Sequence, residues 1–141
     1  MRLTTKGRYA VRALYCLSTF PREKPVPLSE VAKRQNISLN FLEQLFVHLR
    51  KSGIVTSVRG PRGGYRLSKE PTDITIGEIL RSVGETTFPV FCNDDYATGK
   101  RPCPRADDCV THLLWERLGS NINQFLDATT LADVNQLEPR C

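Results

Sequence analysis

Hydrophobic residues near the start of the chain recur at the spacing of an amphipathic helix. The apolar positions follow the series i, i+4, i+7, i+8 and i+11. They are Tyr9, Ala13, Cys16, Leu17 and Phe20. Thr4 or Thr5 can cap this helix by accepting a hydrogen bond from a backbone N–H of its first turn. The proline-rich stretch 21–27 breaks the pattern, so the helix is predicted to end before it, with Cys16 as a small buried hydrophobe.

Two further helical patterns follow and are joined by a short turn. Ser29 is expected to cap the first, over 30–35, and Asn36 suits the tight turn behind it. Ser38 is expected to cap the second, which Gly53 ends. The apolar residues that the second helix is expected to bury are Phe41, Leu42, Leu45, Phe46 and Leu49. Two helices joined in this way predict a helix-turn-helix.

The more exposed face of the second helix carries side chains that are suited to reading base edges. The amide groups of Asn40 and Gln44 can pair with adenine, and the carboxylate of Glu43 can accept a hydrogen bond from the cytosine amino group. In helix-turn-helix proteins the first turns of the second helix contact the bases. Ser38, Asn40, Glu43 and Gln44 are therefore predicted to bind DNA.

A β-hairpin is predicted directly after this helix. Residues 54–59 predict a strand, and a glycine-rich turn leads to a returning strand at 65–67. The tip is expected to present Arg59, Arg62 and Arg66, whose guanidinium groups can approach phosphates or enter a minor groove. The turn lacks the lysine and the following helix of a nucleotide-binding P-loop. The hairpin is thus predicted to be a DNA-binding wing.

Charge is divided unevenly between the two halves of the chain. The net charge is +5 over 141 residues. Residues 1–70 hold 14 Lys and Arg against 4 Asp and Glu, whereas residues 71–141 hold 6 against 11. A basic half joined to an acidic half indicates that the first half meets a polyanion, although a solvated surface also fits the charge alone. Together with the helix-turn-helix, this pattern makes double-stranded DNA the expected partner.

The acidic half predicts a short helix and a long one. Thr75 and Glu78 form a capping box for the short helix, which Gly84 ends. The long helix, over about 109–127, carries an apolar stripe. The residues of this stripe that are predicted to form a dimer interface are Leu114, Trp115, Leu118, Ile122 and Phe125, with Leu126 continuing it.

The apolar stripe has too little partner surface within one chain, because the head uses its own helices for its core. The same helix of a second copy is the predicted partner, and folding back onto the head of a monomer is the alternative. A homodimer also suits DNA, since a two-fold symmetric protein reads an inverted repeat.

Cys92, Cys103, Cys109 and His112 lie within 21 residues and are separated by ten, five and two residues. The segment that holds them is rich in Gly, Pro, Asn and Asp, so it has no apolar core of its own to order it. These four residues are predicted to bind one metal centre. Three thiolates and an imidazole suit tetrahedral zinc and also a two-iron cluster, and ligand chemistry leaves both open.

Other functional classes find little support in the chain. It contains no hydrolase, kinase or hydride-transfer constellation, so neither an enzyme nor a small-molecule substrate is expected. The start lacks the apolar core of a signal peptide and no run is long enough to span a membrane, so we expect a cytoplasmic protein. In a reducing cytoplasm, clustered cysteines favour metal ligands over disulfides. A zinc-stabilised regulator and an electron-transfer protein stay open as alternatives.

Three stretches, 1–11, 37–46 and 57–65, together with the order of three cysteines and a histidine, resemble the IscR-like family of winged-helix regulators. The resemblance reaches from residue 1 to about residue 134. It implies a homodimeric bacterial transcription factor that controls genes for iron-sulfur cluster assembly. Related family members sense nitric oxide, iron or redox state with other ligands, and the histidine favours the IscR branch.

The resemblance also implies particular site residues. It assigns a 2Fe-2S cluster to the ligand positions, which here are Cys92, Cys103, Cys109 and His112. It further implies DNA contacts from Asn40, Glu43, Gln44 and Arg59. One departure is the spacing between the first two cysteines, which is longer here than is usual in the family.

The expected fold is mainly α with a small β-hairpin wing. A winged helix-turn-helix DNA-binding domain with a following short helix is predicted over 1–84. A cysteine-rich cluster-binding loop is predicted over 85–112, and a dimerisation helix with a C-terminal tail over 109–141.

Overall fold

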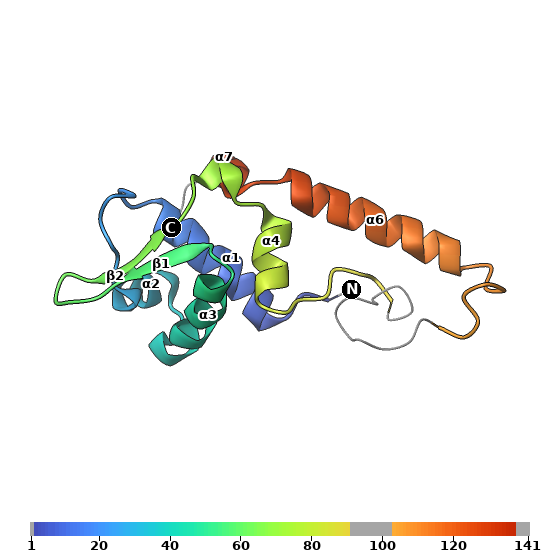
Figure 1. Ribbon diagram of the computed structural model, residues 1–141, viewed down its shortest axis with the longest axis horizontal. Helices are drawn as coiled ribbons and strands as arrows, with labels where there is room; N and C mark the ends of the chain where they lie inside the picture. Colours follow the sequence, from blue (N-terminus) through green and yellow to red (C-terminus); the bar gives the residue numbers. More distant parts are fainter. Residues whose placement is uncertain (1, 91–102, 138–141) are drawn as a thin grey trace.

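A computed structural model describes residues 2–90 and 103–137 of the chain. Most of its elements form a rounded head, and one long helix extends away from the head (Figure 1). The elements are α1 (Thr5–Ser18), α2 (Leu28–Gln35), α3 (Leu39–Lys51), β1 (Val55–Val58), β2 (Gly64–Leu67), the 3-10 helix η1 (Pro71–Asp73), α4 (Ile76–Ser82), α6 (His112–Ala128) and α7 (Leu131–Leu137). The prediction of a mainly helical fold with a small hairpin is confirmed.

The predicted capping residues start α1 and α3. The side-chain oxygen of Thr4 accepts a hydrogen bond from the N–H of Gly7 at 3.4 Å. At α3, the Ser38 hydroxyl accepts from the N–H of Phe41 at 3.4 Å. Between α2 and α3, Asn36 takes a left-handed conformation with φ of 52°, which reverses the chain within the short turn. The helix-turn-helix prediction is thus confirmed in its local geometry.

The predicted start of α2 is wrong. Ser29 does not cap the helix, because α2 already begins at Leu28 and Pro27 precedes it as the capping residue. The fixed φ of proline suits the entry to a helix, and Leu28 gains burial when it joins the first turn. Ser29 is left exposed on the helix surface.

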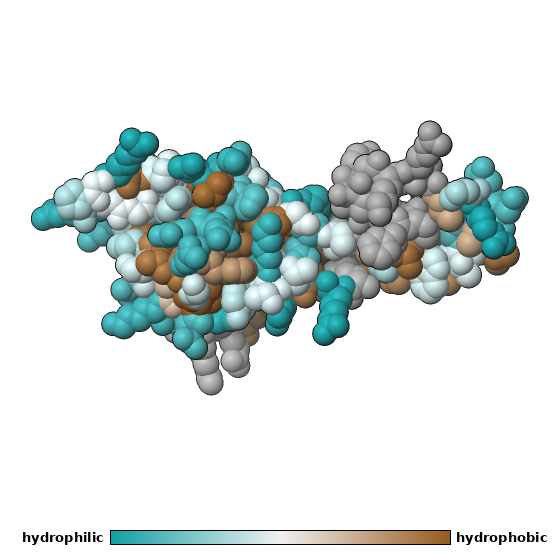
Figure 2. All heavy atoms as spheres, turned by 90° about the horizontal axis from the view of Figure 1, so that it is seen from below, coloured by the Kyte–Doolittle hydropathy of each residue, from teal (hydrophilic) through white to brown (hydrophobic). Residues whose placement is uncertain are grey.

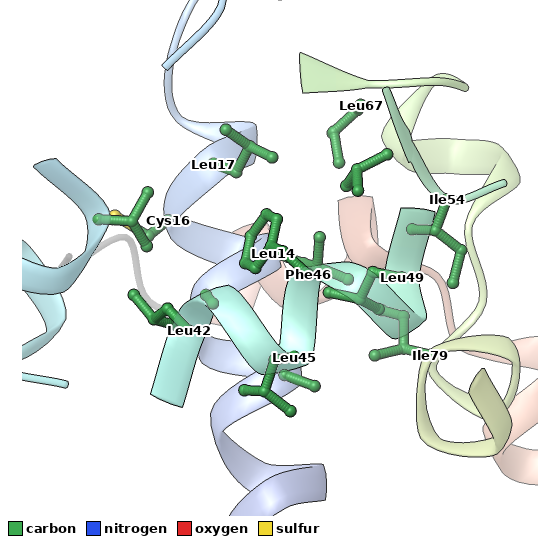
Figure 3. Packing of buried hydrophobic residues seen from close by; sticks show 14 of the residues in the cluster. Leu14, Cys16, Leu17, Leu42, Leu45, Phe46, Leu49, Ile54, Leu67 and Ile79 are labelled. Carbon is green, nitrogen blue, oxygen red and sulfur yellow. The ribbon is translucent and has the colours of Figure 1, made fainter. Parts of the chain in front are cut away.

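Helices α1, α3 and α4 share a single hydrophobic core with the hairpin (Figure 3). Phe46 of α3 is fully buried, and its ring packs edge-on against Tyr65 of β2 with 5.0 Å between the centroids. The other residues of α3 that are buried are Leu42, Leu45 and Leu49. The predicted core residues that are only half-buried are Tyr9, Phe20 and Phe41. Cys16 is fully buried, as expected of a structural cysteine.

The hairpin is tied to the rest of the head by backbone pairing. β1 and β2 are antiparallel, with Val55 opposite Leu67 and Val58 opposite Gly64. Residue Val26, which precedes α2, exchanges two backbone hydrogen bonds of 2.8 Å with Tyr65. Strand β2 is therefore held in place, near the turn of the hairpin, by the chain that leads into the helix-turn-helix.

The long helix α6 is anchored to the head at its C-terminal end. There Arg81 of α4 and Asp127 form an ion pair of 2.5 Å. The next helix, α7, returns to the head, where Leu131 is fully buried and donates its N–H to the carbonyl of Ile74 at 2.9 Å. Only Gly119 is buried among the 17 residues of α6. Within the described ranges, no helix is long and apolar enough to cross a membrane.

Candidate functional site

The predicted reading residues lie together on the open face of α3. Asn40, Glu43 and Gln44 are exposed, and their spacing of three and four residues places them on one side of the helix. Ser38 stands exposed at the helix start. The opposite side of α3 is buried in the core, so packing of that side presents the polar side outward.

Two residues of α1 contact the helix-turn-helix: Tyr9, which the sequence pattern placed only on the apolar side of its helix, and Arg12, which sequence reasoning missed. The ring of Tyr9 packs edge-on against Phe41 of α3, with 5.7 Å between the centroids. Arg12 lies over the Tyr9 ring at 5.1 Å and donates from Nη2 to the carbonyl of Gln35 at 2.6 Å. That carbonyl is at the C-terminal end of α2, where a cation is favourable. The sequence signal for this contact was the spacing of Tyr9 and Arg12, because residues three apart lie on the same side of a helix.

The wing arginines occupy two different places on the hairpin. Arg59 and Arg62 are exposed in the turn, where the N–H of Gly63 donates to the carbonyl of Gly60 at 2.9 Å. Arg66 is exposed as well, but it lies on β2 opposite Thr56 and not at the tip. The expectation that all three arginines share the tip is therefore wrong, because Arg66 is held within the strand ladder, two pairs away from the Val58–Gly64 pair that borders the turn.

The electrostatics of this face favour an anionic partner. Ion pairs in the described ranges engage four basic side chains, namely Arg22, Arg34, Lys69 and Arg81. None of the three wing arginines forms an ion pair with the residues that the structure describes. Their charges are available to phosphates, which bind arginine through charge-assisted hydrogen bonds.

Two of the predicted metal ligands lie in one turn at the start of α6. His112 is the first residue of α6, and its N–H donates to the carbonyl of Cys109 at 3.2 Å. Cys103 begins the preceding run of turns, where its carbonyl accepts from the N–H of Ala106 at 3.0 Å. Both described cysteines of this segment are free thiols. Cys92 lies outside the described residues.

The described part of the segment supplies suitable donors but does not gather them. No group of three or more His, Cys, Asp or Glu in the described ranges is close enough to hold a metal ion. The chemistry of the donors nevertheless fits a metal. The pKa of Cys109 lies below its ordinary value, chiefly because the Thr111 hydroxyl hydrogen-bonds its sulfur at 3.4 Å. The thiolate is the form of cysteine that binds metals.

In the metal-free protein, the pKa of Cys109 is expected to depend on the Thr111 hydroxyl. Replacing Thr111 by valine removes the hydroxyl that stabilises the thiolate, so the pKa of Cys109 should rise and its alkylation should begin at higher pH. Mass spectrometry of the iodoacetamide-treated protein across the neutral and alkaline range measures the shift. Thr72→Val, at another exposed threonine, is the matched control. An unchanged onset in Thr111→Val would contradict the assignment.

The predicted dimerisation residues form an open apolar stripe on α6. Leu114, Leu118 and Phe125 are 56%, 40% and 67% exposed, and their spacing of four and seven residues places them on one side of the helix. Trp115 and Ile122 border them and are half-buried. Figure 2 shows hydrophobic side chains at the surface along the arm that α6 forms. A stripe of this kind on a helix that projects from the head is typical of an interaction surface.

A helix-turn-helix with an open polar face, followed by a hairpin with unpaired arginines, defines a winged helix-turn-helix DNA-binding protein. Comparison with known proteins gives the family. Residues 3–136 match the model of the Rrf2 family, described as an iron-dependent transcriptional regulator. The chain belongs to the Rrf2 family, and it is a DNA-binding transcriptional regulator and not an enzyme.

Named relatives agree with this family. The chain is 46% identical over 134 residues to the HTH-type transcriptional regulator IscR of Serratia proteamaculans, covering 95% of this chain and 79% of that protein. It is also 46% identical to the IscR of Vibrio cholerae over 134 residues, which are 95% of this chain and 75% of that one. The IscR-type resemblance predicted from the motifs is confirmed.

Solved structures show the same fold. The global cysteine regulator CymR of B. subtilis is 34% identical with a TM-score of 0.76, and the match covers 98% of each chain. T. potens IscR is 37% identical with a TM-score of 0.74, covering 98% of this chain and 89% of that one. The electron-transfer alternative is excluded, because the relatives are transcriptional regulators.

Proposed function

We propose that the protein is a homodimeric regulator whose binding to an inverted-repeat operator is modulated by a 2Fe-2S cluster, and that it controls genes for iron-sulfur cluster assembly. Cys92, Cys103, Cys109 and His112 would hold the cluster. The observation that carries this proposal is the turn that joins Cys109 to His112 at the first residue of α6. It places two ligand types on the same helix that presents the apolar stripe. The IscR relatives and the iron-dependent family favour iron over zinc.

DNA recognition in this proposal uses two surfaces of the head. Side chains at the start of α3, namely Ser38, Asn40, Glu43 and Gln44, read base edges in the major groove. Arg59 and Arg62 of the wing contact phosphates or the minor groove, and Arg66 adds a contact from the side of β2. Because a bacterial transcriptional regulator binds chromosomal DNA, we propose that the protein is located in the cytoplasm.

Regulation in this proposal follows from linkage. A cluster supplies bonds that order the segment from Cys92 to His112 at the start of α6. The two heads of the dimer can take an arrangement that binds DNA and one that does not. If the cluster binds one of these arrangements more tightly, it changes DNA affinity by at most the difference between its binding free energies for the two arrangements. DNA must then change cluster affinity by the same factor.

Anaerobic reconstitution with iron and sulfide, followed by visible absorption and metal analysis, tests the cofactor. The wild-type protein is expected to be coloured, with iron and sulfide in equal amounts, and Cys109→Ala and His112→Ala should lose colour or change the spectrum. Cys141→Ser, outside the predicted ligand set, is the matched control and should keep the wild-type spectrum. A colourless protein with tightly bound zinc would support the zinc alternative.

Operator binding by the loaded and the metal-free protein tests the regulation. Both forms are titrated at one salt concentration against a panel of operator sequences, because phosphate contacts make affinity depend on salt. The loaded form should differ from the metal-free form in affinity for at least one class of operator. Equal affinity across the whole panel would overturn modulation by the cluster.

A further inference from the structure

Residues 85–89 form a short non-helical segment between α4 and the first predicted cluster ligand. We call this segment the strap. It consists of Glu85, Thr86, Thr87, Phe88 and Pro89. Glu85 and Thr87 are among the few polar residues buried in the described structure, at 7% and 4% exposure. Burial of polar groups in so short a connection requires specific partners, since an unpaired buried polar group is costly.

The first partner of the strap is the N-terminus of α1. Oε1 of Glu85 accepts hydrogen bonds from the N–H groups of Thr4 and Gly7, both at 3.1 Å, and from the Thr4 hydroxyl. The first N–H groups of a helix have no partner within the helix and carry partial positive charge, so a carboxylate is favourable there. The N–H of Glu85 in turn donates to the carbonyl of Leu80 in α4 at 3.0 Å. Glu85 thus ties α1 to α4.

Gly7 makes this close approach possible. A Cβ atom at position 7 would lie 2.5 Å from Cγ of Glu85. Such a distance does not occur between real side chains, so any larger residue would push Glu85 out of its place. The buried glycine and the buried carboxylate therefore form one fitted contact.

The second partner of the strap is the middle of α6. The Thr87 hydroxyl donates to Oδ1 of Asn123 at 2.5 Å, and Nδ2 of Asn123 donates to the carbonyl of Gly119 at 2.9 Å. A Cβ atom on Gly119 would lie 2.5 Å from Cδ1 of Phe88 and 3.3 Å from Cδ of Pro89. Gly119 is the only buried residue of α6, and the strap is what buries it.

Only Thr86 thus separates Glu85, which contacts α1, from Thr87, which begins the contact with α6. α1 continues from this contact to Tyr9, whose ring packs against Phe41 at the start of the reading helix. α6 carries the apolar stripe and the Cys109–His112 turn. The strap itself leads toward Cys92, three residues after Pro89. The strap therefore contacts both the helix that carries His112 and the helix that packs against the start of α3.

We propose that the strap couples the position of α6 to the N-terminus of α1, with Glu85 and Phe88 as the residues that position α1 for DNA reading. The regulatory part rests on the proposed function, since there the cluster acts on the reading heads through the strap. The mechanical part does not need the cluster, because it concerns contacts between described side chains of a single chain.

Hydrogen exchange in the metal-free protein tests the mechanical part. In Gly119→Ala, the added methyl group forces Phe88 to move. The atoms that this methyl group would meet belong to the strap and not to α1, so any effect on α1 has to pass through the strap. Amide exchange over residues 4–9 should then accelerate by roughly 10-fold, because local opening at the start of α1 becomes easier. Thr87→Val, which keeps the shape and removes the hydroxyl, should act in the same direction. Ser120→Ala, at the exposed neighbouring position of α6, is the matched control.

The outcome of this exchange experiment is decisive by itself. If exchange accelerates only at residues 85–89 and 115–123 and stays unchanged at residues 4–9, the strap is a passive connection and the proposal is wrong. Sedimentation of each variant checks that the oligomeric state is the same, so that a change in assembly is not read as transmission through the strap.

Operator binding tests the regulatory part. The measured quantity is the ratio of DNA affinities between the cluster-loaded and metal-free forms. Glu85→Ala should bring this ratio close to one, whereas Glu85→Gln should keep most of it, because its side-chain oxygen still accepts the hydrogen bonds from Thr4 and Gly7. Glu116→Ala, at an exposed acid of α6, is the control and should leave the ratio unchanged.

The two proposals fail in different ways. If the cluster-loaded and metal-free forms of the wild-type protein bind DNA equally, modulation by the cluster is wrong. The hydrogen-exchange result then still decides whether the strap couples α6 to α1. A wild-type ratio different from one that persists in Glu85→Ala would overturn the regulatory role of the strap and leave the cluster in place.

Discussion

Leu118→Lys is expected to dissociate the proposed homodimer and to weaken operator binding by about 10²–10⁴-fold, the usual gain from linking two binding modules. Leu118 is 40% exposed in the single chain and lies between Leu114 and Phe125 on the open stripe of α6. In a dimer the stripe would be covered, and a lysine there would place an unpaired charge in an apolar interface. The substitution keeps a good helix former, so α6 itself should persist.

Sedimentation and titration of a full inverted repeat against a single half-site separate the two effects of this substitution. A monomer should bind the half-site as well as before and should lose the advantage of the full repeat. Gln124→Lys, at an exposed polar position on another side of α6, is the matched control and should stay dimeric. A Leu118→Lys protein that sediments as a dimer and binds the full repeat normally would rule out the stripe as the interface.

Phe46→Ala is expected to lower the free energy of unfolding by about 3–5 kcal/mol, the range for a large aromatic removed from a packed core. Phe46 is fully buried at the centre of the core and packs against Tyr65 of the wing. Its loss leaves a cavity between α3 and β2, so the reading helix and the wing should both loosen. DNA affinity should fall even where the protein remains folded, because both surfaces that we propose to contact DNA pack against this side chain.

Urea unfolding at one fixed protein concentration measures this loss, since the stability of a dimer depends on its concentration. Val47→Ala, at the next residue of α3 and 37% exposed, is the matched control and should change stability by no more than about 0.5 kcal/mol. A Phe46→Ala protein with wild-type stability would mean that the core closes around the missing ring.

The helix-turn-helix was predictable because its signals are local. A cap such as Ser38 bonds a backbone N–H three residues away, and the left-handed turn at Asn36 is closed by a hydrogen bond to the carbonyl of Ala32, four residues earlier. Helical periodicity likewise identifies the buried side of α3 from a few neighbouring residues. The prediction of Ser29 as a cap failed because Pro27 and the burial of Leu28, two residues and one residue before it, move the helix start toward the N-terminus.

The coupling within the site was not predictable from the sequence. Glu85 lies 78 residues from Gly7 and 81 from Thr4, so no local pattern connects them. The contact of Thr87 with Asn123 spans 36 residues, and that of Arg12 with Gln35 spans 23. From the sequence alone, an acidic residue directly after a helix would be expected at the surface. Glu85 is buried and accepts hydrogen bonds from the start of α1 only because α4 packs against α1.

By itself, the sequence determined the helix-turn-helix, the hairpin, the apolar stripe and the order of the predicted ligands, because residue spacing encodes which side of a helix or strand a side chain occupies. Tertiary structure alone decided that the strap packs against both α1 and α6. It also decided that Arg66 lies on β2 opposite Thr56, away from the wing tip, and that α7 returns Leu131 to the core of the head. These features depend on contacts between distant parts of the chain, which form only when the whole core has packed.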